Sequence, residues 1–251
     1  MNSLKCLKNH YDEKGWVVYK NLFSIKQIHI INSIIDNFLK EKIKSINKVD
    51  RTINFVNNNK RIVKNINSFH KLAESDKIKN YAQKKSVLDI AKVFLNSDPE
   101  FRGCELFAKP AMIGLPSPSH QDNYYWAVKG ANALTIWIAL NISNKNNGCV
   151  YYYDGSHKYG TIKHQPSFAK GSSQKISDIK FLQKFKISYP ELKLGDALIH
   201  HSQVVHGSLQ NISKSNRRGW TIQFKDKNAS YDLEQIKKYE KSLNDQILLS
   251  S

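Results

Sequence analysis

The sequence predicts a mainly β fold of the barrel or jelly-roll type, with helices flanking the β-core. Short runs rich in β-branched and aromatic residues follow one another after about residue 103, turn-forming stretches separate them, and no helical pattern lies between them. The expected strands cover residues 105–113, 133–140, 149–153, 186–189, 197–201 and 219–224. A doubly wound sheet is disfavoured, because its strands alternate with helices.

Helical spacing is found on both sides of this β region. Ser24 stands where it can cap a helix with apolar residues over 28–39, and similar spacing extends over residues 75–95 and 233–248. Residues 16–19 are expected to form a short strand before the first of these helices. We therefore expect helices first, then the β-core, then a last helix.

The chain has no internal repeat and no linker-like segment, so we expect one domain over residues 1–251. Within it, residues 1–100 form a mostly helical part, residues 101–225 the β-core and residues 226–251 the C-terminal helix. Residues 44–68 are polar and irregular.

The chain is strongly basic. Its 39 Lys and Arg against 21 Asp and Glu give a net charge of +18, which suits a nucleic acid, a membrane surface or an anionic small molecule. The basic residues are spread out, however, without a basic stripe interleaved with aromatics, and the richness in Lys, Asn and Ile is typical of an AT-rich genome. We expect no specific nucleic-acid partner, while an anionic metabolite stays open.

No apolar run is long enough for a membrane span, and residues 1–15 lack the apolar core of a signal peptide. Cys6, Cys104 and Cys149 form no C-x-x-C pattern, which disfavours a disulfide framework and a zinc ribbon. We expect a cytoplasmic protein. The sequence carries no signal for its oligomeric state.

Residues 119–126, SHQDNYYW, contain His120 and Asp122 as a His-x-Asp pair, a pattern that His10 and Asp12 repeat. The first pair is distinguished by its distant companions, because His206 follows Asp122 after 84 residues. Two histidines and one carboxylate hold Fe(II) and leave three positions open. Those open positions accept a bidentate 2-oxo acid and then O2.

Eleven residues after His206 comes Arg217, directly before an expected strand. The far carboxylate of a 2-oxo acid calls for a planar and permanently charged fork, which arginine supplies and lysine does not. On a strand, residues i and i+2 point to the same face, so His120 and Asp122 can project together. The third ligand must come from a distant strand, as a jelly roll allows.

This constellation resembles the phytanoyl-CoA dioxygenase (PhyH-like) family of Fe(II)/2-oxoglutarate oxygenases. The likeness covers roughly residues 10 to 225, in the expected order. Beyond the residues above, it rests on Gly15-Trp16-Val17-Val18, Asn147-Gly148-Cys149, Asp154-Gly155-Ser156-His157-Lys158, Leu194-Gly195-Asp196-Ala197, and His206-Gly207-Ser208 with Asn211 and Arg217-Arg218.

The resemblance implies a double-stranded β-helix fold, with His120, Asp122 and His206 as the iron ligands. It further implies that Arg217 binds the C5 carboxylate of 2-oxoglutarate with the Ser208 hydroxyl. By the same resemblance Trp137 lines the cosubstrate pocket, whereas Arg218 points to the opposite face of a regular strand.

The reaction that the resemblance implies is hydroxylation of a small molecule, with Fe(II) as cofactor, 2-oxoglutarate and O2 as cosubstrates, and succinate and CO2 as products. In halogenating relatives a small residue stands in place of the aspartate, so Asp122 favours hydroxylation. The identity of the substrate lies outside what the sequence shows, and the net positive charge favours an anionic one.

Two residues are candidates for contact with the substrate. Tyr124 shares the strand face of His120 and Asp122 if the alternation continues, and Lys109 lies near the cleft entrance as an anion contact. The structural alternatives are a core aromatic for Tyr124 and a solvated lysine for Lys109. His200 and His201 either pack in the core or contact the substrate or the metal ligands.

Other functions stay open. An oxygenase with the same metal site that acts on a nucleic acid or a protein is supported only by the charge. A non-catalytic sensor that keeps the iron and 2-oxoglutarate site is a further alternative; loss of a ligand or of Arg217 would support it, and none is lost. A cupin-like isomerase or metal-binding protein generally needs a histidine-rich ligand set and gives Arg217 no role.

Overall fold

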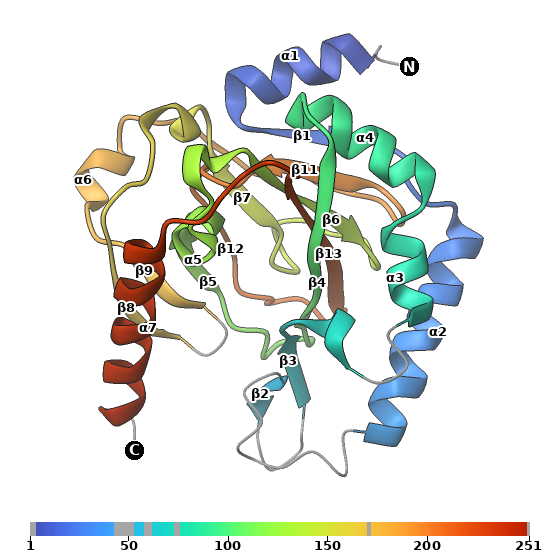
Figure 1. The fold of residues 1–251 in the computed structure, drawn as a ribbon. Helices are drawn as coiled ribbons and strands as arrows, with labels where there is room; N and C mark the ends of the chain where they lie inside the picture. The colour runs from blue at the N-terminus through green and yellow to red at the C-terminus, as the bar shows by residue number, and fades with distance from the viewer. Residues whose placement is uncertain (1–3, 43–52, 58–61, 73–75, 170–171, 250–251) are drawn as a thin grey trace.

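Two antiparallel β-sheets form the centre of the molecule (Figure 1). The computed structural model describes residues 4–42, 53–57, 62–72, 76–169 and 172–249. Within these residues the larger sheet has the strand order β1-β11-β6-β13-β4-β3-β2, and the smaller sheet has the order β10-β7-β12-β5. Strands β8 and β9 pair with each other as a separate hairpin.

The strands of the larger sheet are β1 (Trp16–Tyr19), β2 (Ile53–Asn57), β3 (Ile62–Ile66), β4 (Pro99–Lys109), β6 (Ala133–Ala139), β11 (Ala197–His201) and β13 (Arg217–Asp226). Those of the smaller sheet are β5 (Ser117–His120), β7 (Val150–Tyr153), β10 (Ile187–Ser188) and β12 (His206–Ser208). The hairpin consists of β8 (His164–Ala169) and β9 (Ser172–Ile176).

Helices lie mainly outside the two sheets. Helices α2, α3 and α4 run along one side of the larger sheet, and α7 stands on the other side of the molecule beside the β8–β9 hairpin (Figure 1). The α-helices are α1 (Leu4–Lys14), α2 (Ile25–Lys42), α3 (Asp76–Ala82), α4 (Lys85–Leu95), α5 (Asp122–Trp126), α6 (Ile179–Leu182) and α7 (Leu233–Leu248), and short 3-10 helices cover Phe69–Lys71, Lys129–Ala131 and Ser156–Tyr159.

Helix α2 begins at a capping box, as the sequence predicts for Ser24. The backbone N–H of Ser24 donates to Oε1 of Gln27 over 2.9 Å, and the backbone N–H of Gln27 donates to Oγ of Ser24 over 3.3 Å. From there the helix packs Ile28, Ile31 and Ile35 against the sheet with no exposed surface.

The two faces of strand β6 have different surroundings, the hydrophobic core on one side and the space between the sheets on the other. All of its residues from Ala133 to Ala139 are buried. Ile136 and Ile138 belong to the core beneath the helices, whereas Trp137 and Ala139 pack with residues of the smaller sheet. Because alternate residues of a strand point to opposite faces, Thr135 and Trp137 are left to face the space between the sheets.

The structure confirms the predicted fold class, mainly β with a double-stranded β-helix core and flanking helices. The last predicted helix has the predicted bounds, and the pattern over residues 75–95 is divided into α3 and α4. Parts of the segment 44–68 that was expected to be irregular form β2 and β3, which pair with each other at the edge of the larger sheet. Helix α1 and the β8–β9 hairpin were not predicted either.

Candidate active site

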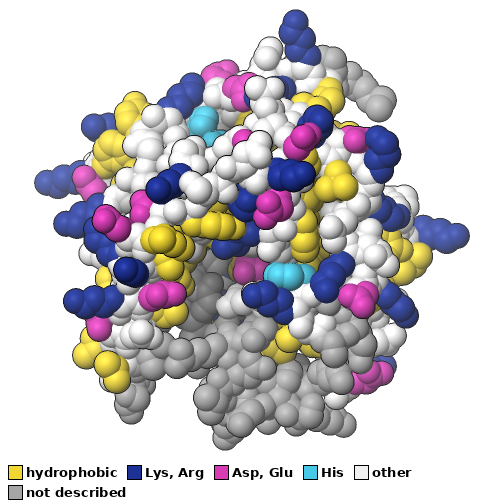
Figure 2. Space-filling model, viewed as in Figure 1, with side chains coloured by type: hydrophobic (Ala, Val, Ile, Leu, Met, Phe, Trp, Pro, Cys, Tyr) yellow, Lys and Arg dark blue, Asp and Glu magenta, His cyan; other side chains and the backbone are white. Residues whose placement is uncertain are grey.

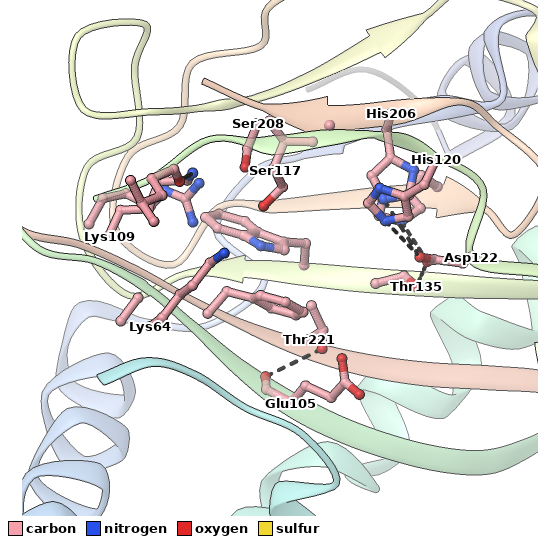
Figure 3. Close-up of a pocket in the computed structure, with 18 of the residues that line it drawn as sticks. Lys64, Glu105, Lys109, Ser117, His120, Asp122, Thr135, His206, Ser208 and Thr221 are labelled. Atoms are coloured by element: carbon pink, nitrogen blue, oxygen red, sulfur yellow. Dashed lines mark hydrogen bonds and ion pairs between the residues drawn. The ribbon is translucent and has the colours of Figure 1, made fainter. Parts of the chain in front are cut away.

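The three predicted ligands meet at one point between the sheets (Figure 3). Nε2 of His120 lies 3.7 Å from Oδ1 of Asp122, and Nε2 of His206 lies 3.6 Å from the same oxygen. One ligand atom from each residue lies within 4.8 Å of the other two. Metal–ligand bonds of roughly 2.0–2.2 Å place neighbouring ligand atoms only a few ångströms apart, so the three residues fit one ion.

The pairing of strands β5 and β12 brings these residues together. His206 at the start of β12 is directly paired with His120 at the end of β5. After His120 the chain leaves the strand and α5 begins at Asp122, which brings the carboxylate back toward the two rings. Gln121 points away and fixes the turn, because its side-chain amide donates to the carbonyls of Gly160 and Gln203 over 2.8 and 2.7 Å.

The histidines are held in the form that binds a metal. Nδ1 of His120 is bonded to the carbonyl of Pro118 over 2.8 Å, and Nδ1 of His206 to the carbonyl of Val204 over 3.0 Å. Since a carbonyl only accepts, each Nδ1 carries the proton and each Nε2 presents its lone pair to the site. Burial lowers the pKa of both rings to about 4, so both are neutral near pH 7.

The two oxygens of Asp122 have different surroundings. Oδ2 accepts a hydrogen bond from Oγ1 of Thr135 over 2.7 Å and one from Nε2 of His200 over 3.2 Å, while Oδ1 faces the two ligand histidines. One oxygen is therefore left for a metal. Burial by itself raises the pKa of Asp122, but the surrounding histidines, His206 first, outweigh it and hold that pKa well below its usual range.

His200 links Asp122 to Tyr152 through hydrogen bonds of its two ring nitrogens. Its Nδ1 accepts a hydrogen bond from the hydroxyl of Tyr152 over 2.8 Å, since its Nε2 must carry a proton to donate to Asp122. His200 is thus buried and in contact with a predicted ligand. His201 instead lies against His157, with ring centroids 5.4 Å apart, on the side of α1.

The predicted cosubstrate residues lie in the same pocket as the three ligands. Trp137, Ser208 and Arg217 line it together with His120, Asp122 and His206. The Arg217 side chain is 2% exposed, its guanidinium carbon lies 5.1 Å from the centre of the Trp137 ring, and its Nε donates to the carbonyl of Gly148 over 3.2 Å. Burial lowers the pKa of Arg217 to about 10, so the guanidinium stays charged at neutral pH.

Lys109 lies beside Arg217, because the two residues are directly paired between β4 and β13. It lines the pocket, is 5% exposed and donates from Nζ to the carbonyl of Leu115. Burial first, and then the charges of Arg217 and Lys64, lower the pKa of Lys109 to about 6. It is therefore no solvated surface lysine, and Figure 3 shows it at the end of the pocket away from His120 and Asp122.

Tyr124 does not lie where the sequence argument placed it. Residues 122–126 form α5, so the strand alternation that put Tyr124 beside the ligands ends at His120. The Tyr124 ring stacks on His164 with centroids 4.0 Å apart, and Tyr124 is not among the residues that line the pocket. The structural reason for choosing Tyr124 was wrong, and its contact with a substrate stays a prediction.

Several pocket residues were missed by the sequence analysis. Thr135 holds Asp122, and Glu105 and Gln223 line the pocket from β4 and β13. Alternation was the available signal, because Glu105 lies four residues before Lys109 and Thr135 two before Trp137 on the same strand faces.

Two histidines and one carboxylate that share a pocket with a buried arginine are the arrangement of iron- and 2-oxoglutarate-dependent oxygenases. The family model described as phytanoyl-CoA dioxygenase (PhyH) matches residues 11–219. The chain belongs to the phytanoyl-CoA dioxygenase family. The predicted family, the enzyme class of Fe(II)/2-oxoglutarate-dependent dioxygenases and the cofactors are thereby confirmed.

Similar curated proteins include the peroxisomal phytanoyl-CoA dioxygenase of Bos taurus, which is 23% identical over 235 residues, or 89% of this chain and 69% of the relative. The peroxisomal enzyme of Mus musculus is 25% identical over 232 residues, covering 86% of this chain and 67% of that protein. The phytanoyl-CoA dioxygenase of Arabidopsis thaliana is 29% identical over 117 residues, covering 47% and 41%.

Solved structures share the fold. EctD from S. alaskensis with 2-oxoglutarate and 5-hydroxyectoine matches with a TM-score of 0.74 and 19% identity, covering 92% of this chain and 78% of that one. The carbocyclase SnoK from nogalamycin biosynthesis matches with a TM-score of 0.73 and 19% identity, covering 92% and 87%. In the part of the chain that the structure describes, no helix is long and apolar enough to cross a membrane.

Proposed function

We propose that this dioxygenase hydroxylates a small metabolite and releases succinate and CO2. His120, Asp122 and His206 would hold the iron, and Arg217 with Ser208 would bind the C5 carboxylate of 2-oxoglutarate. The observation that carries the proposal is that a single pocket is lined by the three-ligand cluster and by the buried guanidinium of Arg217.

The donor set suits the group that it would hold. Two neutral imidazoles and one carboxylate oxygen would hold an iron ion, and bound iron with its cosubstrates would supply the oxidising power. The protein's own part is to fix geometry. Thr135 and His200 orient Asp122, and the two bonds to Gly148 use two of the five N–H donors of Arg217, leaving others for a carboxylate.

Trp137 and Lys109 would complete the cosubstrate end of the pocket. The Trp137 ring lies against the guanidinium and gives one wall of the space a flat apolar surface. Lys109, next to Arg217, lines the same end of the pocket, so the anion that it would contact is the cosubstrate carboxylate. Tyr124, outside this wall, would approach only the part of a substrate that extends beyond the pocket.

The charge distribution supports a small substrate rather than a nucleic acid. Figure 2 shows lysine and arginine side chains dispersed over the displayed face, with acidic and apolar side chains between them. Polyanion recognition calls for basic residues clustered on one face or groove. We place the enzyme in the cytoplasm as part of the same proposal, and the net charge alone supports an anionic metabolite.

The proposal is tested by measuring succinate formed from 2-oxoglutarate in the presence of Fe(II) and O2, without added substrate. We expect slow succinate release by the wild-type chain, loss of it in Arg217→Ala, and little change in Arg218→Ala. The matched control is apt because Arg218 pairs with Asp36 on the outer side, with 2.5 Å between Nη1 and Oδ1. If the chain binds Fe(II) and 2-oxoglutarate but forms no succinate, either alone or with added metabolites, a non-catalytic sensor is favoured instead.

A further inference from the structure

A carboxylate that the proposed reaction does not use lies in the pocket. On β4 the side chains of Glu105, Phe107 and Lys109 line the pocket, while those of Cys104 and Leu106 are fully buried in the core on the helix side. Figure 3 shows Glu105 below the metal ligands, away from Lys109. Its direct partner across the sheet is Thr221 on β13, which in turn is paired with Trp137.

The pocket is electrically polarised along β4. The charged guanidinium of Arg217, beside Lys109, marks one end, and Glu105 lies four residues from Lys109, or roughly 13 Å along an extended strand. Asp122, on the Glu105 side, is close enough that its charge adds to burial in raising the pKa of Glu105 to about 7. A dianionic cosubstrate would occupy the cationic end, so the acidic end is left for the other reactant.

Among the residues that the structure describes, Glu105 forms an ion pair with no cation. The charge of Arg102 and hydrogen bonds with the Ser68 backbone and the Gln223 side chain lower the pKa of Glu105, but burial and Asp122 outweigh them. The Arg102 guanidinium itself donates to Oε1 of Gln223 over 2.9 Å and lies 4.6 Å from the Trp126 ring centre. Removing a carboxylate from water without a paired cation is costly, so a ligand that brings positive charge there would bind favourably.

We propose that Glu105 is a specificity-determining residue of the pocket and that it binds a protonated amine of the metabolite to be oxidised. The inference rests on the proposed function, because it assigns the acidic end of the pocket to the substrate. The net charge of the chain favours an anionic substrate, whereas the local charge of Glu105 favours a cationic group on the substrate. On the face shown in Figure 2 the charged side chains are dispersed, whereas Glu105 lines the pocket itself.

The test uses three probes of similar size and different charge, namely butylammonium, 1-butanol and butyrate. Each is titrated without O2 into the wild-type chain loaded with Fe(II) and 2-oxoglutarate, and the change in the visible absorption band is followed at constant ionic strength. We expect butylammonium to bind at least tenfold more tightly than the other two. Glu105→Gln should abolish this preference, and Glu105→Asp should keep part of it.

The matched control is Glu41→Gln, which changes the net charge equally at an exposed position on α2 and should keep the preference. A second readout is the melting temperature of the metal-free chain, which butylammonium should raise in wild type and leave unchanged in Glu105→Gln. No preference for butylammonium in wild type, or a preference that survives in Glu105→Gln, overturns the inference. A missing absorption band with an intact melting effect overturns the proposed function and leaves the amine site standing.

Discussion

The hydroxyl of Thr135 donates a hydrogen bond of 2.7 Å to Oδ2 of Asp122. Together with the bond from His200, it turns that oxygen away from the two ligand histidines and leaves Oδ1 facing them. Residues that orient a metal ligand in this way affect metal affinity although they do not touch the metal.

Thr135→Val should therefore weaken Fe(II) binding by about tenfold, because the carboxylate loses a donor that fixes its rotation. Thr135→Ser keeps the hydroxyl and should bind nearly as wild type. The measurement is an anaerobic competition titration of Fe(II) against a chelator of known affinity. Equal affinities of the valine and serine variants would show that the hydrogen bond does not orient the ligand.

Arg217→Lys should raise the dissociation constant of 2-oxoglutarate about 30-fold, equivalent to about 2 kcal/mol, because a lysine cannot reproduce the planar fork of donors. The control is Arg218→Lys, which alters the next residue of β13 on the other face, where the arginine pairs with Asp36. Calorimetric titration of both variants checks the expectation. A larger loss of 2-oxoglutarate affinity in Arg218→Lys than in Arg217→Lys would mean that Arg218, and not Arg217, binds the cosubstrate.

Gly219 provides the space in which the Trp137 ring lies. A Cβ at this position would stand 1.9 Å from Cζ2 of Trp137, so Gly219→Ala must displace the ring. We expect a loss of about 1–3 kcal/mol in the free energy of unfolding, together with weaker 2-oxoglutarate binding. Thermal and urea unfolding measure the first effect.

A second substitution separates this clash from other causes. In the Trp137→Phe background the smaller ring leaves room for the added methyl group, so Gly219→Ala should there be nearly neutral. Additive costs of the two substitutions would show that the methyl group meets something other than the indole.

Lys109 gives the chain a specific pH dependence. Its pKa is about 6 when folded and rises to that of an ordinary lysine on unfolding, so between these values the unfolded chain binds more protons. Stability should therefore rise with pH across this window, by up to about 1.4 kcal/mol per pH unit from this residue. Lys109→Met should be more stable than wild type near pH 6 and should approach it near pH 10, as melting at several pH values would reveal. Parallel pH profiles of the two chains would mean that Lys109 stays protonated in the fold.

The sequence predicted most of the β-core and the gathering of the ligand candidates, for an identifiable physical reason. His120, Asp122 and His206 lie between expected strands and Arg217 lies just before one, and in a double-stranded β-helix those strands converge, although β5 and β12 themselves were not predicted. The family resemblance supplied the ligand set. Local pattern alone had not distinguished His120 and Asp122 from the pair at residues 10 and 12.

The errors have equally local causes. Helix α5 spans five residues, too few for helical periodicity to show, and so Tyr124 was assigned to a strand face. Strands β2 and β3 are short strands with polar residues at one edge of the larger sheet, and their pairing depends on β4, to which β3 is bonded. Glu105 and Thr135 follow the alternation of their strands, but alternation cannot tell a pocket from solvent.

The central claim is that this pocket binds Fe(II) and 2-oxoglutarate together. The most direct test is anaerobic titration of the metal-free chain with both, followed by the weak visible charge-transfer band of the joint complex. We expect the band in wild type, its appearance only at much higher 2-oxoglutarate in Arg217→Ala, and its absence in Asp122→Ala. A wild-type chain that shows no band at saturating Fe(II) and 2-oxoglutarate would contradict the account.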